Sequence, residues 1–363
     1  MAMVLVKKPS STLTRYKRSG LSVVPGTAVR LGVAKNSGVK RKSKSPSPAS
    51  ISSTGSGSRK KNKVRSLKSR VWTFRHNIFN DKSVLGTRTR TGGYVRQSLV
   101  VNFSEKYYIG KKLGTGGFGT VWAGVRISDG VKVAIKHVAR SRVIAWDTCR
   151  GQKVPQELRF LLDVQHVPGV VKMLDFYERD DSFIYIMERP DNYMDLFDFI
   201  TKKKTLTESM ARDFFRQVTD MVIACSESNI VHRDIKDENI LVNLDTFKLT
   251  LIDFGSGGLI KPGYYTEFDG TRVYAPAEWI SNERYTWEGM TVWSLGILLY
   301  DMVCGDIPWQ EDEEIAAARL QFPVGLSPEV RKLIGGCLRL NTTQRLSLSD
   351  LKTHPWLTGE AEE

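Results

Sequence analysis

The pattern of hydrophobic and polar residues divides the chain into a strand-rich part and a helix-rich part. Up to Arg189, short runs of β-branched and aromatic residues are separated by turn residues, which is typical of strands. The predicted strands cover residues 107–113, 120–126, 131–136 and 183–187. Beyond Arg189, residues 208–228 carry an apolar stripe at helical spacing, and residues 293–303 are apolar on every side. This second pattern predicts a buried central helix.

Charged residues are distributed unevenly along the 363 residues, and they separate a basic N-terminal part from the rest of the chain. The formal net charge is +15, but residues 1–100 contain 23 Lys and Arg against one acidic residue, a net charge of +22. Residues 101–363 contain 31 basic and 38 acidic residues, a net charge of −7. The basic pI is therefore a property of the N-terminal part and does not indicate a nucleic-acid-binding fold.

Residues 1–70 are rich in Ser, Lys, Arg, Gly and Thr and almost lack aromatic residues. Such a segment buries too little apolar surface to offset its ordering entropy, so we expect residues 1–103 to be a mostly disordered basic extension. Residues 40–44 and 59–65 form basic clusters, and two Ser-Pro pairs follow the first. These clusters predict either nuclear import and non-specific polyanion binding or a merely solvated tail. Residues 71–103 hold enough aromatic residues to pack, although their partner is not predicted.

Other classes of protein are disfavoured. The apolar run 293–303 is too short to span a bilayer, and Asp301 interrupts it, so we expect no membrane association. Residues 1–6 lack a secretory hydrophobic region. The four cysteines, at positions 149, 225, 304 and 337, lie far apart without metal-binding spacing. They indicate reduced thiols of a cytoplasmic or nuclear protein, which we expect to be monomeric.

The most specific motif is the segment H-R-D-I-K-D-E-N-I at residues 232–240. It is similar to the catalytic loop of protein kinases, in which the Asp, here Asp234, accepts a hydroxyl proton and the Asn, here Asn239, holds a metal ion. Asp253-Phe254-Gly255, the second metal-binding motif, follows nineteen residues after Asp234. Together these motifs predict Mg²⁺ held by Asn239 and Asp253.

Upstream motifs complete the set in the required order. Residues 113–121 read L-G-T-G-G-F-G-T-V, a glycine-rich loop whose backbone N–H groups can approach phosphates. The loop lies between two predicted strands, which argues against a dinucleotide-binding unit because that unit requires a following helix. The next strand ends in V-A-I-K at Lys136, the predicted ligand of the ATP phosphates. Glu157 follows Pro155 beside the apolar face of a predicted helix and is the expected partner of Lys136.

Four motifs in order with compatible gaps predict an α+β, bilobal protein-kinase fold, with a small β-rich N-lobe and a larger helical C-lobe. We expect the kinase domain to cover residues 104–357, followed by a short acidic tail at 358–363. Lys236, two residues after Asp234, is typical of serine/threonine kinases and would offset charge on the transferred phosphoryl group. A pseudokinase is disfavoured because Lys136, Asp234, Asn239 and Asp253 are all present. A nucleic-acid-binding function would be only an added activity of the tail.

Residues 104–357 resemble the Pim serine/threonine kinases in particular. The resemblance rests on E-R-P at 188–190, D-L-F-D-F-I at 195–200, F-D-G-T-R-V-Y at 268–274 and W-S-L-G-I-L-L-Y-D-M-V-C-G-D-I-P at 293–308. It implies that the Glu188 carbonyl accepts from adenine, while Pro190 lacks the usual second hinge N–H. The adenine walls are then Leu113, Val121, Ala134, Leu241 and Ile252, with Met187 as gatekeeper. The nucleotide contacts implied overall are Leu113, Gly114, Thr115, Gly116, Gly117, Phe118, Gly119, Thr120, Val121, Ala134, Lys136, Glu188, Asp195 and Leu241.

The resemblance also carries expectations about regulation and substrates. Thr271 resembles the residue that braces the Asp234–Lys236 pair. Glu267 and Asp269 would satisfy Arg233 without phosphorylation, which predicts a constitutively active enzyme; activation through Thr266 is the alternative. Glu238 resembles a residue that binds a substrate arginine, and further acidic residues border the groove: Asp195, Asp198, Asp237, Asp306, Asp312 and Glu313. Protein substrates with basic residues before Ser or Thr are therefore predicted, and the chain's own tail serines fit this pattern.

The sequence departs from the expected pattern at the hinge insert N-Y-M at 192–194, which bears on inhibitor selectivity more than on catalysis, and at two further points. Thr291 stands where most kinases have an Asp that anchors the catalytic loop, a residue that Pim kinases also lack. Ala277 replaces a proline, although Glu278 and its expected partner Arg345 remain. Neither change removes a group required for phosphoryl transfer.

Overall fold

The structure is a computed structural model that describes residues 83–88, 94–101, 103–117, 119–149 and 152–359, with the backbone course alone for residues 83–101. The predicted disorder, basic clusters and Ser-Pro pairs of residues 1–82 lie outside the described residues. Residues 360–363 of the predicted acidic tail lie outside them as well.

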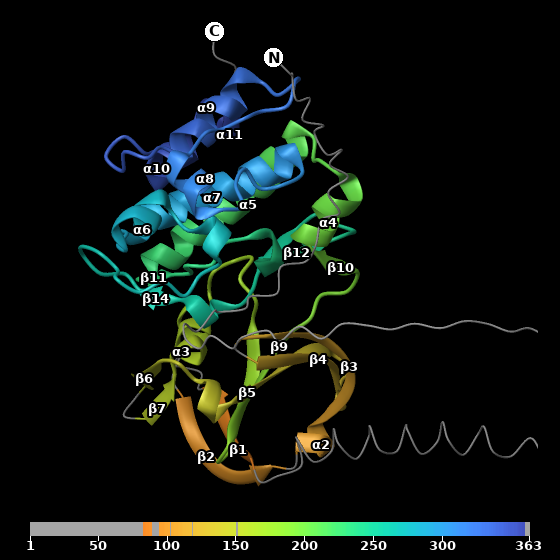
Figure 1. Ribbon diagram of the computed structural model, residues 1–363. Coiled ribbons are helices and arrows are strands. Elements are labelled where there is room, and N and C mark those ends of the chain that lie inside the picture. The colour runs from red at the N-terminus through yellow and green to blue at the C-terminus, as the bar shows by residue number, and fades with distance from the viewer. Residues whose placement is uncertain (1–82, 89–93, 102, 118, 150–151, 360–363) are drawn as a thin grey trace, which may run out of the picture. The chain divides into compact units, whose positions relative to one another are not determined.

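Seven antiparallel strands form one sheet, in the spatial order β2-β1-β8-β9-β5-β4-β3. Their bounds are β1 (Ser83–Arg88), β2 (Tyr94–Val101), β3 (Tyr107–Gly116), β4 (Gly119–Arg126), β5 (Lys132–Ala139), β8 (Met173–Glu178) and β9 (Ser182–Glu188). The four predicted strands correspond to β3, β4, β5 and β9. Figure 1 shows this sheet in the lower half of the picture and most helices above it.

Two strands of this sheet precede position 104. The β1 backbone pairs with β8 through Val84 and Glu178, and β2 continues the sheet beyond β1. The short β1 sequence, SVLGTR, has neither alternation nor a β-rich composition, so its strand is set by pairing with the β8 edge. The sheet thus reaches further toward the N-terminus than the expected start of the kinase domain.

Helix α3 (Gln156–Asp163) follows the hairpin of β6 (Trp146–Cys149) and β7 (Gln152–Pro155). It packs on the sheet through Leu158 and Leu162, which are buried with Val138, Phe183 and Tyr185. The short helix α2 (Phe103–Lys106) precedes β3. This packing fixes the helix that carries Glu157 against the strand that carries Lys136.

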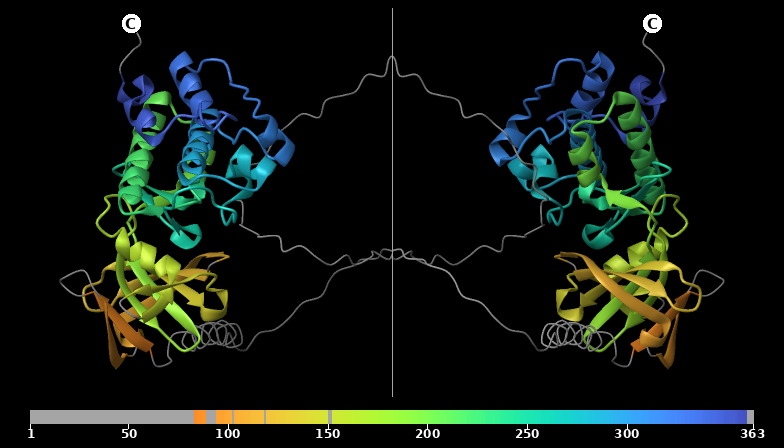
Figure 2. Two further views of the ribbon diagram at one scale, coloured as in Figure 1. Left: turned by 90° about the vertical axis from the view of Figure 1, so that its left-hand side faces the viewer. Right: turned by 90° about the vertical axis from the view of Figure 1, so that its right-hand side faces the viewer.

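The second lobe is mainly helical. Its helices are α4 (Leu196–Lys203), α5 (Glu208–Glu227), α6 (Ala277–Asn282), α7 (Trp287–Cys304), α8 (Asp312–Ala317), α9 (Pro328–Cys337), α10 (Leu348–Thr353) and α11 (Pro355–Thr358). The lobe also contains two small sheets. One consists of β10 (Tyr193–Asp195), β12 (Ile240–Asn243) and β13 (Leu249–Leu251), and the other of β11 (Ile230–Val231) and β14 (Gly258–Leu259). The segments 232–239 and 252–257 connect strands of one sheet to strands of the other. Both views in Figure 2 show the same division into strands and helices.

Helix α7 is the centre of this lobe, as its all-round apolar sequence predicts. Thr286 caps its first turn by accepting from the Gly289 N–H (3.2 Å), and Gly305, at φ 87°, ends it by donating to the Asp301 carbonyl (2.8 Å). Trp293 and its neighbours along the helix are fully buried. Helix α5 packs beside α7 through the predicted apolar stripe.

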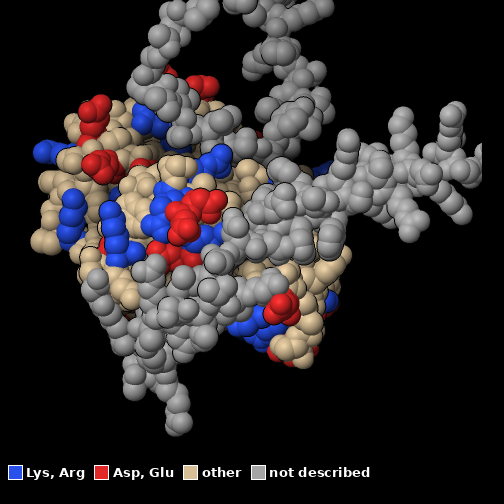
Figure 3. Space-filling view, turned by 90° about the horizontal axis from the view of Figure 1, so that it is seen from below, with Lys and Arg blue, Asp and Glu red and all other residues tan. Residues whose placement is uncertain are grey.

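Acidic and basic side chains lie next to one another on the described part of the face shown in Figure 3. Three ion pairs lie in or beside the sheet lobe: Arg126–Asp129, Arg140–Glu178 and Lys132–Asp191. The exposed Arg126–Asp129 and Lys132–Asp191 pairs contribute little to stability.

A partly buried carboxyl group lies in the aromatic part of the sheet lobe. The hydroxyls of Tyr107 and Tyr177 donate to Asp175 Oδ2 at 3.4 and 3.2 Å, and both rings pack with Phe103. Burial raises the pKa of Asp175 to about 6, although Lys106 and these hydrogen bonds act in the opposite direction. Folding therefore favours the protonated carboxyl group.

This arrangement predicts that the folded lobe loses stability as the pH rises. Between the ordinary Asp pKa and about 6, the folded state binds more protons at Asp175 than the unfolded state, so stability falls across that interval. We expect Asp175→Asn to abolish this loss and to raise the melting temperature at pH 7 relative to wild type. Thermal unfolding from pH 4.5 to 7.5 measures it, with the exposed Asp180→Asn as control. Parallel curves for wild type and Asp175→Asn would contradict the assignment.

Candidate active site

The glycine-rich loop is the hairpin between β3 and β4. Gly116 pairs with Gly119, and Phe118 lies outside the described residues. Gly119 has φ 150°, and a Cβ there would lie 2.4 Å from the His137 carbonyl oxygen, so glycine is required. Around Gly114, Gly116 and Gly117, by contrast, a Cβ would meet no atom within 4 Å. The three glycines therefore leave the open space that the phosphates of a nucleotide would need.

Lys136 joins three elements of the fold. Its ammonium donates to Glu157 Oε1 on α3 and to Asp253 Oδ1 at 2.8 Å, and the lysine is only 5% exposed. Burial alone would lower the pKa of Lys136, but the two carboxylates raise it above its usual value. The Lys136 ammonium in turn lowers the pKa of Asp253 against the effect of burial. The predicted Lys136–Glu157 pair is therefore present, with Asp253 as a second partner.

Asp253 itself has a left-handed backbone, with φ 64° and ψ 80°. This conformation is uncommon outside glycine and is tolerated by Asp better than by most residues. Phe254, the next residue, is fully buried and its ring contacts the His232 ring at a centroid distance of 4.7 Å. His232 Nε2 donates to the Ile252 carbonyl (3.0 Å), so the segments before Asp234 and before Asp253 are tied together.

The catalytic loop and the activation segment meet at Asp234. Thr271 donates to Asp234 Oδ1 through both its N–H (2.9 Å) and its hydroxyl (2.7 Å). The Lys236 ammonium donates to the same Thr271 hydroxyl at 2.8 Å and lies 3.5 Å from Asp234 Oδ2. Asn239 Nδ2 donates to the carbonyl and to Oδ2 of Asp234 at 2.8 and 2.9 Å. Asp234 is thus held from three sides.

Gly270 permits the close contact between the activation segment and the catalytic loop. A Cβ on Gly270 would lie 2.5 Å from the Arg233 carbonyl oxygen, so no side chain fits between the two segments at this point. Burial alone would lower the pKa of Lys236, but Asp234 and Glu238 (3.0 Å) raise it. The cation therefore remains charged beside the carboxylate that the sequence predicts as the proton acceptor.

Arg233 binds the activation segment mainly through backbone oxygens. Its Nε donates to the Ser256 carbonyl (2.6 Å), and its Nη2 donates to the Gly257 carbonyl (2.9 Å) and reaches Asp269 Oδ2 at 3.4 Å. The sequence analysis named Asp269 but missed both carbonyls, since a backbone acceptor leaves no signature in the sequence. In the described part of the chain, no contact joins the Glu267 carboxylate to Arg233; only its carbonyl is engaged, by the Tyr285 hydroxyl (2.9 Å).

The expected adenine pocket lies between the hinge and β12. Glu188 ends β9, and its N–H is taken by the Lys172 carbonyl (2.9 Å), which leaves its own carbonyl outside that pairing. Met187 is nearly buried opposite Ala134. Leu241, on β12, and Ile252 are half-buried. Asp195 accepts from the Asp198 N–H (2.8 Å) as the cap of α4, so part of its carboxylate has a structural use.

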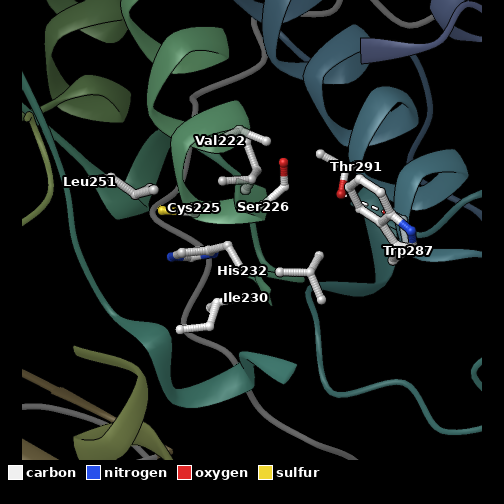
Figure 4. A pocket seen from close by; sticks show the side chains of 10 residues that line it. Val222, Cys225, Ser226, Ile230, His232, Leu251, Trp287 and Thr291 are labelled. Atoms are coloured by element: carbon white, nitrogen blue, oxygen red, sulfur yellow. Dashed lines mark hydrogen bonds between the residues drawn. The ribbon is translucent and has the colours of Figure 1, made fainter. Parts of the chain in front are cut away.

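Among the described residues, the Thr291 side chain makes no hydrogen bond to the catalytic loop. Its hydroxyl donates to the Trp287 carbonyl (2.7 Å) in its own helix. Figure 4 shows the small cavity that Thr291 lines with His232 and Ser226. Its volume is about 10 Å³, roughly the space of one water molecule.

Elsewhere in this lobe, Arg345 donates twice to Glu278 at 2.7 Å, as expected from the sequence.

The comparisons with known proteins agree with this geometry. The description "Protein kinase domain" matches residues 107–357. Serine/threonine-protein kinase pim-2 of Danio rerio is 46% identical over 266 residues, which cover 70% of this chain and 86% of that protein. Serine/threonine-protein kinase prk-2 of Caenorhabditis elegans is 40% identical over 259 residues, covering 70% of this chain and 59% of the relative. The chain belongs to the Pim family of serine/threonine protein kinases.

A further relative is less similar. The mouse PAS domain-containing serine/threonine-protein kinase is 34% identical over 261 residues, which cover 70% of this chain but 19% of that protein. This Pim-family chain is thus a protein-serine/threonine kinase that uses ATP, with protein substrates. In the described residues, no helix is long and apolar enough to cross a membrane.

Two side chains of this Pim-family site, Asn239 and Asp253, have the oxygen atoms to bind a metal ion that phosphate groups also coordinate. The described residues hold no group of three or more His, Cys, Asp and Glu that could bind a metal alone. Asn239 uses its Nδ2 for Asp234, which leaves Oδ1 to accept, and Asp253 Oδ2 is not engaged by Lys136. Two hard oxygen donors beside an open loop fit an ion such as Mg²⁺, which takes few protein ligands together with substrate phosphates.

The contacts of Thr271 predict a role for its hydroxyl in turnover. Thr271→Val keeps the shape but removes the hydroxyl that bridges Asp234 and Lys236, so we expect kcat to fall by about 10–100-fold, the equivalent of a buried hydrogen bond to a charged group. Thr271→Ser, which keeps the hydroxyl, should remain within a few-fold of wild type. Steady-state peptide phosphorylation measures both. Equal losses in the two variants would show that the methyl group, rather than the hydroxyl, matters.

Proposed function

We propose that the enzyme transfers the ATP γ-phosphate, with Mg²⁺, to Ser or Thr preceded by basic residues, and that it does so without prior phosphorylation. The convergence of Lys136, Asp234 and Asp253 at one site supports the chemistry most directly, because their sequence positions are far apart. The acidic catalytic loop and the occupied Arg233 support the substrate class and the regulation.

Each predicted residue then has a chemical role. Asp234 orients the substrate hydroxyl and takes its proton, and Lys236 offsets the charge of the phosphoryl group in transfer. Lys136, aligned by Glu157, and the glycine-rich loop hold the phosphates. Asn239 and Asp253 would hold Mg²⁺, which neutralises phosphate charge.

The acidic residues expected along the peptide groove are not equivalent. Glu238 lies in the catalytic loop, and its Oε2 is 3.0 Å from the Lys236 ammonium. Asp312 is already paired with Arg272 through two hydrogen bonds of 3.0 and 2.7 Å. Asp237 is 3% exposed and accepts from the Tyr274 hydroxyl (3.3 Å), so it is a structural residue with no access to a peptide. We assign the contact with a substrate arginine to Glu238 because it matches the family residue with this role; its side chain is 12% exposed, and Lys236 is its partner in this structure.

Glu238→Gln should weaken binding of arginine-containing peptides in particular. We expect KM for a peptide with arginines before its serine to rise by about 5–30-fold, as for loss of a partly buried charge pair. KM for the same peptide with alanines in place of those arginines should change much less. The variant Glu329→Gln, in the first turn of α9, is the control. An equal rise for both peptides would exclude charge recognition at this residue.

The activation segment should keep its active arrangement after dephosphorylation. Arg233 is occupied by the Ser256 and Gly257 carbonyls as well as Asp269, so no phosphate is required to neutralise it. We expect phosphatase treatment and Thr266→Ala to leave kcat/KM within about twofold of wild type, which corresponds to a change under about 0.5 kcal/mol. Asp269→Asn, which leaves both carbonyls in place, should reduce it only moderately. Loss of activity after phosphatase treatment would favour activation through Thr266.

A further inference from the structure

The 3₁₀ turn η4 (Arg272–Tyr274) of the activation segment lies between two contacts with the catalytic loop. Thr271, which precedes the turn, donates to Asp234 Oδ1. The hydroxyl of Tyr274, which ends the turn, donates to Asp237 Oδ1 at 3.3 Å. The Tyr274 N–H also donates to the Thr271 carbonyl (2.9 Å), so the turn holds the two donors at a fixed separation. The activation segment therefore binds the catalytic loop at two of its carboxylates.

Asp237 begins a second 3₁₀ turn, η2 (Asp237–Asn239), which carries further groups of the catalytic loop. Asp237 Oδ1 accepts from the N–H of Glu238, the second residue of the turn, at 3.0 Å. Asn239, the last residue, donates to Asp234 Oδ2 at 2.9 Å. A 3₁₀ turn of three residues has poor hydrogen-bond geometry and little stability of its own. The placement of Glu238 and Asn239 therefore depends on how firmly Asp237 is held.

Tyr274 is itself bound to the central helix of the lobe. The Ser294 hydroxyl, on α7, donates to the Tyr274 carbonyl at 3.3 Å. Ser294, Tyr274 and Asp237 are all buried, where water competes little with hydrogen bonds between protein groups. Thr291, one turn earlier on α7, uses its hydroxyl for the Trp287 carbonyl of the same helix. The hydrogen bonds of Ser294 and Tyr274 thus connect α7 to the catalytic loop.

We propose that Tyr274 is a positioning residue that connects α7 to the catalytic loop through Asp237. It replaces the direct anchor that most kinases have in the aspartate at the position of Thr291. Ser294 fixes the backbone of Tyr274, and the Tyr274 hydroxyl makes the bond to the loop. The hydroxyl is therefore the group on which the connection depends.

The consequence for turnover rests on the proposed function, in which Asp234 takes the substrate proton. Without the Tyr274 hydroxyl, η2 is held less firmly, and Asn239 at its end aligns Asp234 less well. We therefore expect kcat to fall. The ATP phosphates are assigned to Lys136 and the glycine-rich loop, which lie in the other lobe, so KM for ATP should stay close to that of wild type.

Hydrogen–deuterium exchange of the full chain, followed by mass spectrometry, tests the connection without catalytic turnover. The matched variants are Tyr274→Phe and Tyr300→Phe; the buried Tyr300 also lies in the helical lobe, and its hydroxyl bonds the Gln321 carbonyl. We expect exchange in residues 232–240 to become about tenfold faster in Tyr274→Phe, the equivalent of one hydrogen bond to a charged group, and to stay unchanged in Tyr300→Phe. Equal exchange of this segment in all three proteins, or equal acceleration in both variants, would overturn the proposal.

A double-mutant cycle on kcat for peptide phosphorylation tests the route from α7. Ser294→Ala removes the donor to the Tyr274 carbonyl. We expect kcat to fall about tenfold in Tyr274→Phe and about threefold in Ser294→Ala, with no further loss in the double variant. KM for ATP should stay within about twofold of wild type, which a general loss of folded structure would not explain.

Additive losses in the cycle would show that Ser294 acts separately from the Tyr274 hydroxyl, and they would overturn the proposed route. If exchange responds as expected but kcat is unchanged in Tyr274→Phe, the connection stands and its link to the proposed function fails.

Discussion

The organisation of this kinase depends on one buried cation. Lys136 lies on β5, Glu157 on α3 and Asp253 in the segment that follows β13, so the two ion pairs of Lys136 join three separately formed elements. Removing one partner of such a buried cluster leaves an uncompensated charge, which typically costs about 3–5 kcal/mol. The same removal would also release α3 or the segment of Asp253 from β5. Stability and alignment of the site therefore have a common origin here.

Asp234 is positioned by a second, separate network. In most kinases an aspartate on the central helix anchors the catalytic loop, but Thr291 bonds within α7 and a small cavity lies beside it. Anchoring instead comes from the activation segment, where Thr271 gives Asp234 two hydrogen bonds, and from Asn239. Order in the activation segment and order at Asp234 are therefore coupled through Thr271.

Sequence spacing predicted the parts of the site that are side chains in fixed motifs. The strands around the glycine-rich loop and the Lys136–Glu157 pair follow from residue type and order, whereas the Thr271 brace was expected from the resemblance to Pim kinases. What escaped prediction depends on backbone and packing. The Ser256 and Gly257 carbonyls that bind Arg233 have no sequence signature, and β1 forms because the β8 edge is available rather than because of its composition. Asp237 was expected near the peptide groove because sequence position does not report burial.

The aromatic packing of the activation segment explains how order can arise without a phosphate. Tyr265 stacks on Tyr285 at 5.3 Å, Phe268 stacks on Trp279 at 5.4 Å, and the Arg233 guanidinium lies 5.5 Å from the Tyr265 ring centre. Each aromatic pair contributes about 0.5–1.5 kcal/mol beyond the area that it buries, and a cation over a ring adds a similar amount. Their sum is comparable to the one to three charge-assisted bonds that a phosphate would form. These contacts are formed without a phosphate, and they connect Tyr285 and Tyr265 to Arg233 and through it to the catalytic loop.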